Sequence, residues 1–235
     1  MDIKKQIIAL GGGGVGTDNL NTALDKYKLQ ASGKTKPKIA FIPTAVGDSA
    51  FAIERFYRAF NNNIAEPSHL PLFNRDERNL ENYLLDQDII EVSGGNTLNM
   101  LSIWENHGID KILEKAWDQG IILTGASAGM ICWFESSVTD SYGPLKELKT
   151  GLGFLKGSAC PHFDGEIHRR PIYENLIKSK TLPPGIALDD YVAAHYINEK
   201  LHKLVTPKKG SKGYLLDLED NKINEKVIDP HILDA

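Results

Sequence analysis

The sequence of 235 residues predicts an α/β fold in which a doubly wound, mostly parallel sheet is flanked by helices. Short apolar runs without polar alternation recur in the N-terminal half, and such runs are typical of strands that helices cover on both faces. Segments with a helical period of 3.6 residues lie between these runs, as in parallel sheets. The composition, 41% hydrophobic and 25% charged, is that of a globular protein. Because no repeat or linker interrupts the chain, we expect one domain over residues 1–235.

The elements follow in chain order. Strands are expected at residues 6–10, 38–43, 88–92, 121–124 and 185–188. Helices are expected at 53–60 and 109–117, where apolar residues recur at spacings of three and four, and at 168–178. After about residue 136 the pattern loosens into a stretch with glycines and prolines, to which we assign no helix or strand. Two apolar runs at 213–218 and 222–228, separated by polar residues, predict a C-terminal hairpin.

Charge and cysteine content limit the classes of partner. Lys and Arg number 27 against 31 Asp and Glu, so there is no basic excess to hold a nucleic acid, and we expect no nucleic-acid partner. The apolar run 7–10 ends at glycines and is too short for a signal or membrane segment. Cys132 and Cys160 are too few for a disulfide framework and lack metal-ligand spacing. We expect a cytoplasmic protein without metal or membrane contact, and the oligomeric state stays open.

The most informative motif is Gly125-Ala126-Ser127-Ala128-Gly129, which lies between an apolar strand and an apolar helical segment. This G-x-S-x-G context is that of a nucleophile elbow, in which a serine occupies a strained strand-to-helix turn. The small neighbours let the strand and the helix pass closely, and the Ala128 N–H would face a developing oxyanion, helped by the helix dipole. The plainer alternative is a tight turn that happens to contain a serine.

A second oxyanion donor is expected in Ser93-Gly94-Gly95-Asn96-Thr97, after the strand at 88–92. Bare glycine backbone can approach a reacting carbonyl closely, and Gly95 is the candidate donor. The alternative is a glycine turn with Asn96 or Thr97 as helix N-cap, and the two can coexist.

Among the seven histidines, His162 stands out because Pro161 and Phe163 hold it in a short rigid stretch after a glycine-bearing loop. A histidine next to phenylalanine can equally be a structural residue. The residues alone therefore leave its role open between general base and core histidine.

Taken together, Val92 to Leu98, Gly125 to Gly129 and Pro161-His162-Phe163 resemble the peptidase E (aspartyl dipeptidase) family of serine peptidases, which includes cyanophycinase. The resemblance implies a sheet similar to that of class I glutamine amidotransferases. It also implies a chain order of oxyanion glycine, serine, histidine and carboxylate. On this basis Ser127 would be the nucleophile, His162 the general base, and Gly95 and Ala128 the oxyanion donors, with no cofactor.

The resemblance leaves the third member of the triad open. Family members carry a glutamate on a later loop, and Asp190 occupies the matching place, one residue after Asp189. Asp140, after the elbow segment, matches another acid assigned this role. An aspartate is shorter by one methylene, so its loop must approach the histidine more closely.

The implied substrate is a small peptide, above all a dipeptide with N-terminal aspartate, and β-aspartyl peptides of the cyanophycinase type are the alternative. Such a site must hold a carboxylate and an ammonium group. Arginine suits the carboxylate, and an acid suits the ammonium. The candidate substrate-binding residues are Asn96, Asp164, Arg169 and Arg170.

Three other functions compete. An α/β-hydrolase esterase would use Ser127, Asp190 and then His202 or His231, although no His-Gly oxyanion motif is present. A dinucleotide-binding protein would use the G-x-G-x-x-G match at residues 11–16, but the second strand ends without the ribose-binding acid. The third is a catalytically silent binding module on the same fold.

Overall fold

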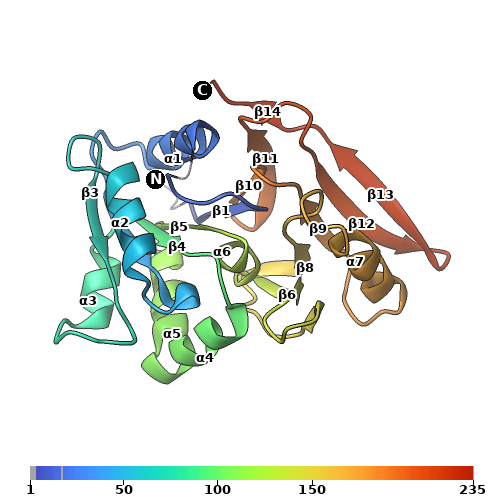
Figure 1. Cartoon of the computed structure of the whole chain (residues 1–235), viewed down its shortest axis with the longest axis horizontal. Helices are drawn as coiled ribbons and strands as arrows, with labels where there is room; N and C mark the ends of the chain where they lie inside the picture. The colour runs from blue at the N-terminus through green and yellow to red at the C-terminus, as the bar shows by residue number, and fades with distance from the viewer. Residues whose placement is uncertain (1–3, 17, 235) are drawn as a thin grey trace.

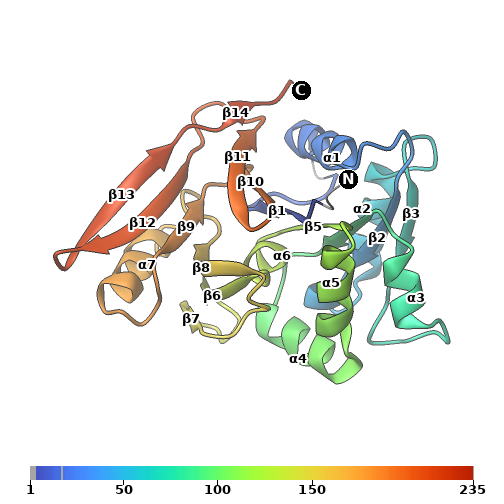
Figure 2. The ribbon, with the colours of Figure 1, turned by 180° about the vertical axis from the view of Figure 1, so that it is seen from behind.

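The computed structural model describes residues 4–16 and 18–234, which form two sheets with helices packed around them (Figures 1 and 2). The strands are β1 (Gln6–Leu10), β2 (Lys38–Ile42), β3 (Glu66–His69), β4 (Ile89–Val92), β5 (Ile122–Ala126), β6 (Phe134–Thr139), β7 (Lys146–Leu148), β8 (Leu155–Cys160), β9 (Gly185–Leu188), β10 (Ala193–Ile197), β11 (Lys200–Thr206), β12 (Gly213–Glu219), β13 (Lys222–Ile228) and β14 (His231–Ile232). The helices are α1 (Asn19–Ala31), α2 (Ala50–Ala59), α3 (Leu80–Leu85), α4 (Thr97–His107), α5 (Ile109–Asp118), α6 (Ala128–Ile131) and α7 (Arg169–Lys178). The predicted α/β class is confirmed.

The larger sheet has the order β14-β11-β10-β1-β5-β4-β2-β3, and the five strands from β1 to β3 in this order are parallel. Successive side chains along its strands pack into two hydrophobic cores, one on each face of the sheet. Ile7 packs with α3, α4 and α5, whereas Ile8 packs with α1 and α2 on the opposite face. Because helices cover both faces, both sets of side chains are apolar, which explains the continuous apolar runs.

A second sheet of order β13-β12-β9-β8-β6-β7 lies beside the first and was not predicted as a separate sheet. The stretch after residue 136, for which no strand was expected, supplies most of β6 together with β7 and β8. These strands escaped hydrophobic patterning because buried positions carry small polar residues, among them Ser136, Ser137 and Thr139. The predicted C-terminal hairpin is confirmed as β12 and β13, and it extends this second sheet through pairing of β12 with β9.

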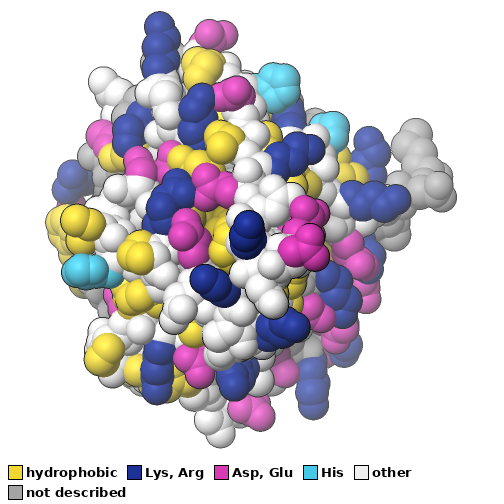
Figure 3. Space-filling view, turned by 90° about the vertical axis from the view of Figure 1, so that its right-hand side faces the viewer, with side chains coloured by type: hydrophobic (Ala, Val, Ile, Leu, Met, Phe, Trp, Pro, Cys, Tyr) yellow, Lys and Arg dark blue, Asp and Glu magenta, His cyan; other side chains and the backbone are white. Residues whose placement is uncertain are grey.

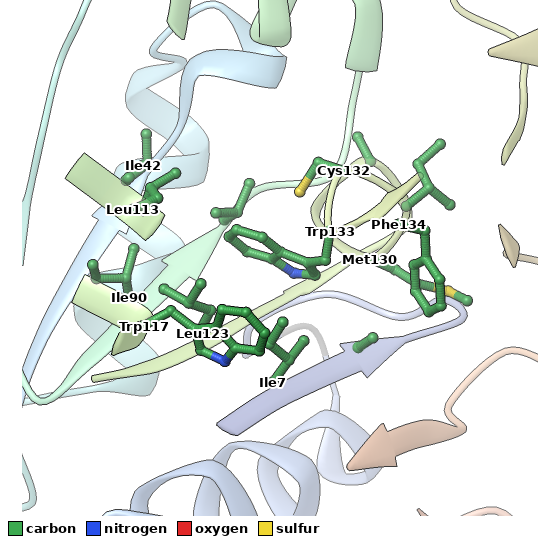
Figure 4. Packing of buried hydrophobic residues seen from close by; sticks show 14 of the residues in the cluster. Ile7, Ile42, Ile90, Leu113, Trp117, Leu123, Met130, Cys132, Trp133 and Phe134 are labelled. Carbon is green, nitrogen blue, oxygen red and sulfur yellow. The ribbon is translucent and has the colours of Figure 1, made fainter. Parts of the chain in front are cut away.

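Aromatic and aliphatic side chains fill the space beneath α6 (Figure 4). Trp133, in the turn after α6, projects toward Leu123 of β5 and Trp117 of α5, whereas Met130 of α6 lies beside Phe134. Trp133 has no exposed surface. Interiors of this density resist displacement of the backbone, so the packing fixes the segment that follows β5.

A buried ionic cluster, here called the Lys28 cluster, links α1 to β4. The Lys28 ammonium donates to Asp25 at 3.0 Å and to Glu91 at 2.9 Å, and all three side chains are buried. Burial raises the pKa of the Glu91 carboxyl. Removing one partner of such a cluster leaves uncompensated charge in the interior, so the cluster holds α1 at one position on the sheet.

The face that carries the second sheet shows basic and acidic side chains interspersed, with no field of one sign (Figure 3). Within residues 4–16 and 18–234, no helix combines the length and apolar character needed to cross a bilayer.

Candidate active site

Ser127 lies at the turn between β5 and α6 in a backbone conformation that residues with a side chain rarely adopt, with φ 56° and ψ −109°. The two flanking glycines permit this turn. A Cβ at Gly125 would lie 2.5 Å from the Val92 carbonyl oxygen, and one at Gly129 would lie 2.4 Å from the same oxygen. The turn therefore has the geometry of a nucleophile elbow, and the predicted need for small residues has a definite cause, which is the close approach of β4.

The segment after Ser127 is shorter than expected, because α6 comprises a single turn, Ala128–Ile131, before the chain enters β6. A helix dipole grows with the number of aligned peptide units, so the expected dipole contribution at Ser127 is small and this expectation is corrected. The N–H groups of Met130 and Ile131 donate to the Ser127 carbonyl at 2.9 and 3.0 Å, which closes this single turn.

Gly95, the other expected donor, follows β4 with φ +127°. A Cβ at this residue would lie 2.3 Å from the Ala45 carbonyl oxygen, so the backbone admits only glycine here. The Asn96 side chain also caps α4, accepting from the Asn99 N–H at 2.9 Å, and its amide donates to the Ser141 carbonyl at 3.1 Å. The glycine turn and the helix cap thus coexist.

His162 and Asp190 form a pair. His162 Nδ1 lies 2.6 Å from Asp190 Oδ1, and the side chains are 21% and 27% exposed. The hydrogen bond from His162 lowers the pKa of Asp190, so this carboxyl stays ionised at neutral pH. The His162 backbone has φ 52°, and its N–H donates to the Gly11 carbonyl at 3.0 Å. Ionised Asp190 therefore orients the ring with Nε2 directed away from it.

Two glycines make room for this pair. A Cβ at Gly12 would lie 1.7 Å from Asp190 Oδ1 and 2.6 Å from His162 Nδ1, and one at Gly165 would lie 2.3 Å from Asp190 Oδ2. The short aspartate therefore reaches the histidine because both neighbouring loops lack side chains where they pass it. The N-terminal glycine cluster thus runs past this pair at Gly11 and Gly12.

The other two candidate acids have other partners than His162. Asp189 is 4% exposed and accepts from the Lys212 N–H at 2.8 Å. Burial raises its pKa. Asp140 lies 3.9 Å from the Arg169 guanidinium and has a 60% exposed side chain. Among the described residues, the hydrogen bond and ion pair of the His162 ring are with Asp190, so geometry favours Asp190 as the partner of the histidine.

These groups open into a pocket of about 260 Å³. Its walls are Gly95, Asn96, Ser127, Asp140, Ser141, His162, Glu166 and Arg169. The described residues show no hydrogen bond between Ser127 and His162, and such catalytic contacts often tighten only when substrate is bound.

Of the candidate substrate-binding residues, Arg169 and Asn96 line the pocket. Arg169 is 2% exposed, and its Nε donates to Glu166 at 2.8 Å. Arg170 corrects the expectation, because it points the other way, where it stacks over Phe163 and pairs with Glu225 of β13. It cannot fork a substrate carboxylate together with Arg169.

Asp164 is likewise engaged in structure rather than lining the pocket. Its Oδ1 accepts from the Asp190 N–H at 2.8 Å, which fixes the loop that carries Asp190. Glu166, which follows two residues later, does line the pocket and supplies an acid beside Arg169.

Ser141 is a pocket residue that no sequence motif indicated. Its hydroxyl accepts from the Thr97 N–H at 2.9 Å and from the Leu98 N–H at 3.3 Å, so a loop after β6 caps the start of α4. The contact ties this loop to the Gly95 turn. No sequence signal reveals it, because the two segments are 44 residues apart.

The histidines of the esterase alternative lie outside the pocket. His202 is exposed on β11, where its ring contacts His195, and His231 is exposed on β14. His195 is buried and bonded to Tyr27 at 2.6 Å, and burial lowers its pKa to about 4. Among the described residues, no group of three or more His, Cys, Asp or Glu is arranged to hold a metal ion.

Comparisons with known proteins give the family and the fold. The model of peptidase family S51 matches residues 7–204. A Bacillus subtilis (strain 168) protein described as uncharacterized peptidase YgaJ is 48% identical over 221 residues, 94% of this chain and 96% of its own length. Two crystal structures share the fold: a peptidase from an acI-B1 Actinobacterium (TM-score 0.72, 18% identity, 95% of this chain and 96% of that one) and a putative peptidase E protein from Listeria monocytogenes EGD-e (TM-score 0.59, 15% identity, 96% and 100%).

Proposed function

We propose, because this chain belongs to peptidase family S51, the family of peptidase E, that it is a serine peptidase of short peptides with Ser127 as nucleophile. The observation that carries the proposal is the convergence on one pocket of Ser127 in its strained turn and His162 paired with Asp190. A serine hydroxyl is a weak nucleophile unless a base removes its proton, and the paired histidine is the base within the same pocket.

The reaction is an acyl transfer. Asp190 accepts the Nδ1–H of His162, which leaves Nε2 free to take the Ser127 proton as the hydroxyl attacks the peptide carbonyl. The backbone N–H groups of Gly95 and Ala128 stabilise the oxyanion, and each such donor contributes about 2.7–4 kcal/mol in the transition state. His162 then protonates the leaving amine, and water repeats the sequence on the acyl-enzyme.

The preferred substrate is a dipeptide with N-terminal aspartate. Arg169 is the buried cation of the pocket and can receive the side-chain carboxylate of that residue. Asp140, largely exposed at the pocket wall, and Glu166 can receive the α-ammonium group. A pocket with one cation and two acids suits a zwitterionic residue that carries an extra carboxylate better than an uncharged one.

A dipeptide screen tests this function. We expect hydrolysis of Asp-X dipeptides, loss of it in Ser127→Ala, and labelling of Ser127 by a fluorophosphonate probe. Faster hydrolysis of β-Asp-X than of Asp-X would show that the preferred substrates are β-aspartyl isopeptides. A folded wild type that is not labelled and cleaves no peptide would make the chain a silent binding module.

Two histidine variants separate the peptidase from the esterase arrangement. His162→Ala is expected to lose activity, whereas His202→Ala, a matched change at an exposed ring on β11, is expected to keep it. The opposite pattern, or faster cleavage of a p-nitrophenyl ester than of any dipeptide, would overturn the peptidase assignment of this pocket.

A further inference from the structure

A second pocket, here called the Arg55 pocket, adjoins the candidate active site. It has a volume of about 130 Å³, and its walls include Arg55 of α2, Val46, Glu91, Ser93 and Gly94. A Cβ at Gly94 would lie 3.5 Å from the Ser127 Cβ, and Gly94 is the residue before the proposed oxyanion donor. Val46 Cγ1 would lie 2.9 Å from a Cβ at that donor, Gly95. The two pockets are therefore separated by no more than the turn that carries the proposed oxyanion hole.

Two polar atoms of the Arg55 pocket lack a hydrogen bond within the described residues, although the Arg55 guanidinium packs over the Phe51 ring at 5.7 Å. Among the described residues, Arg55 Nε and Ser93 Oγ are buried without a hydrogen bond. Ser93 is 7% exposed, and Arg55 forms no ion pair in the described part of the chain. Buried polar groups in native proteins nearly always have partners, so unpaired ones beside a pocket indicate a ligand with acceptor atoms.

The charges around this pocket favour a carboxylate. Glu91 is its acidic wall residue, and that carboxyl is already held by the ammonium of Lys28 at 2.9 Å. Arg55 is the cation of the wall that has no acidic partner in residues 4–16 and 18–234. A guanidinium fork matches a planar carboxylate, and a serine hydroxyl can donate a further hydrogen bond to it.

We propose that the Arg55 pocket binds the C-terminal carboxylate of a dipeptide substrate. The inference rests on the proposed peptidase function and deepens it. In a dipeptide this carboxylate lies one residue beyond the scissile bond, a span of about 3.3–3.6 Å. Gly94, a wall residue of the Arg55 pocket, comes close enough to Ser127 that a Cβ at Gly94 would lie 3.5 Å from the Ser127 Cβ. The arrangement gives each substrate carboxylate its own arginine, Arg169 for the aspartyl side chain and Arg55 for the chain end.

The arrangement also explains why the enzyme would prefer dipeptides to longer peptides. A tripeptide places a neutral amide where the dipeptide has its carboxylate, so Arg55 and Ser93 would stay without a charged partner. Sites with buried polar groups reject ligands that leave those groups unpaired. The Arg55 pocket would thereby make the enzyme a dipeptidase.

The test compares Asp-Leu with Asp-Leu amide, which differ at the chain end. We expect wild type to favour the free acid by about 10- to 100-fold in kcat/KM, the range of a charge-assisted hydrogen bond. In Arg55→Gln the ratio of acid to amide is expected to fall to near one. Arg58→Gln, the same change on the same helix at an exposed arginine paired with Glu54, is expected to keep the wild-type ratio.

Several outcomes would overturn the proposal. The first is a wild-type ratio of acid to amide near one, and the second is an unchanged ratio in Arg55→Gln. The third is that Arg55→Gln instead loses the discrimination between Asp-Leu and Asn-Leu, which would assign Arg55 to the aspartyl side chain. A ratio is insensitive to the fraction of folded enzyme, and Arg55→Lys, which keeps the charge without the fork, should retain part of the preference.

Binding to Ser127→Ala separates this inference from the proposed function. Calorimetry on that variant is expected to show Asp-Leu binding about 10- to 100-fold more tightly than its amide, with the difference lost when Arg55→Gln is added. Equal binding overturns the Arg55 inference whether or not the wild type is active. Absent hydrolysis with a retained binding preference overturns the peptidase function alone.

Discussion

Gly12→Ala is the substitution that tests the proposed triad without replacing a reactive side chain. The new methyl group would lie 1.7 Å from Asp190 Oδ1, where ordinary contact begins at 3.4 Å. The carboxylate must therefore move by about 1.7 Å, because the backbone of Gly11 and Gly12, just after β1, is hydrogen-bonded to Val192 and Tyr191. A displacement of that size breaks the 2.6 Å hydrogen bond to His162.

The expected consequence is the loss of the orienting acid. Removing such an acid from a serine triad costs about 10³- to 10⁴-fold in kcat, because the histidine loses its tautomer and the stabilisation of its charged form. We expect a fall of this order in kcat/KM for an Asp-X dipeptide in Gly12→Ala. The free energy of unfolding should drop by only about 1–3 kcal/mol, as for an overpacked site.

The assay pairs steady-state hydrolysis with urea unfolding. Gly33→Ala serves as the control, since that glycine has φ +69° and open space around its Cβ, so it reports backbone strain away from the pocket. A folded Gly12→Ala enzyme with kcat/KM within about tenfold of wild type would refute the idea that the His162–Asp190 pair activates Ser127.

Ser127→Gly should be more stable to urea than Ser127→Ala by about 1 kcal/mol, because glycine relieves the strain at φ 56°; equal stabilities would contradict strain at the elbow. The pKa of Asp190 is lowered in the folded state, so its contribution to stability is present above its unfolded pKa of about 4 and fades as the pH falls. The difference in unfolding free energy between wild type and Asp190→Asn should thus shrink between pH 7 and pH 3, and urea titrations at both pH values would show whether it does. Lys28→Met should lower the free energy of unfolding by about 3–5 kcal/mol in the same assay, because it leaves the buried carboxylates of the Lys28 cluster without a cation. A loss below about 1 kcal/mol would contradict the ionisation of those carboxylates.

The sequence by itself was sufficient for features that depend on local physics. Continuous apolar runs predicted β1, β2, β4 and β5, because strands covered on both faces need apolar side chains at every position. Glycines around Ser127 predicted a strained turn, since the spacing of small residues is itself the steric requirement. The family resemblance rested on such local motifs.

Tertiary structure decided what depends on segments far apart in the chain. The family resemblance put Asp190 first and left Asp140 and Asp189 as alternatives, and it is Asp190 that the structure pairs with His162, because Gly12 and Gly165 leave space beside it. The strands β6 and β8 could not be predicted from hydrophobic patterning, because small polar residues occupy several of their buried positions. Arg169 and Arg170 are neighbours in sequence yet diverge in space, one into the pocket and one onto β13, because successive helical residues point in different directions.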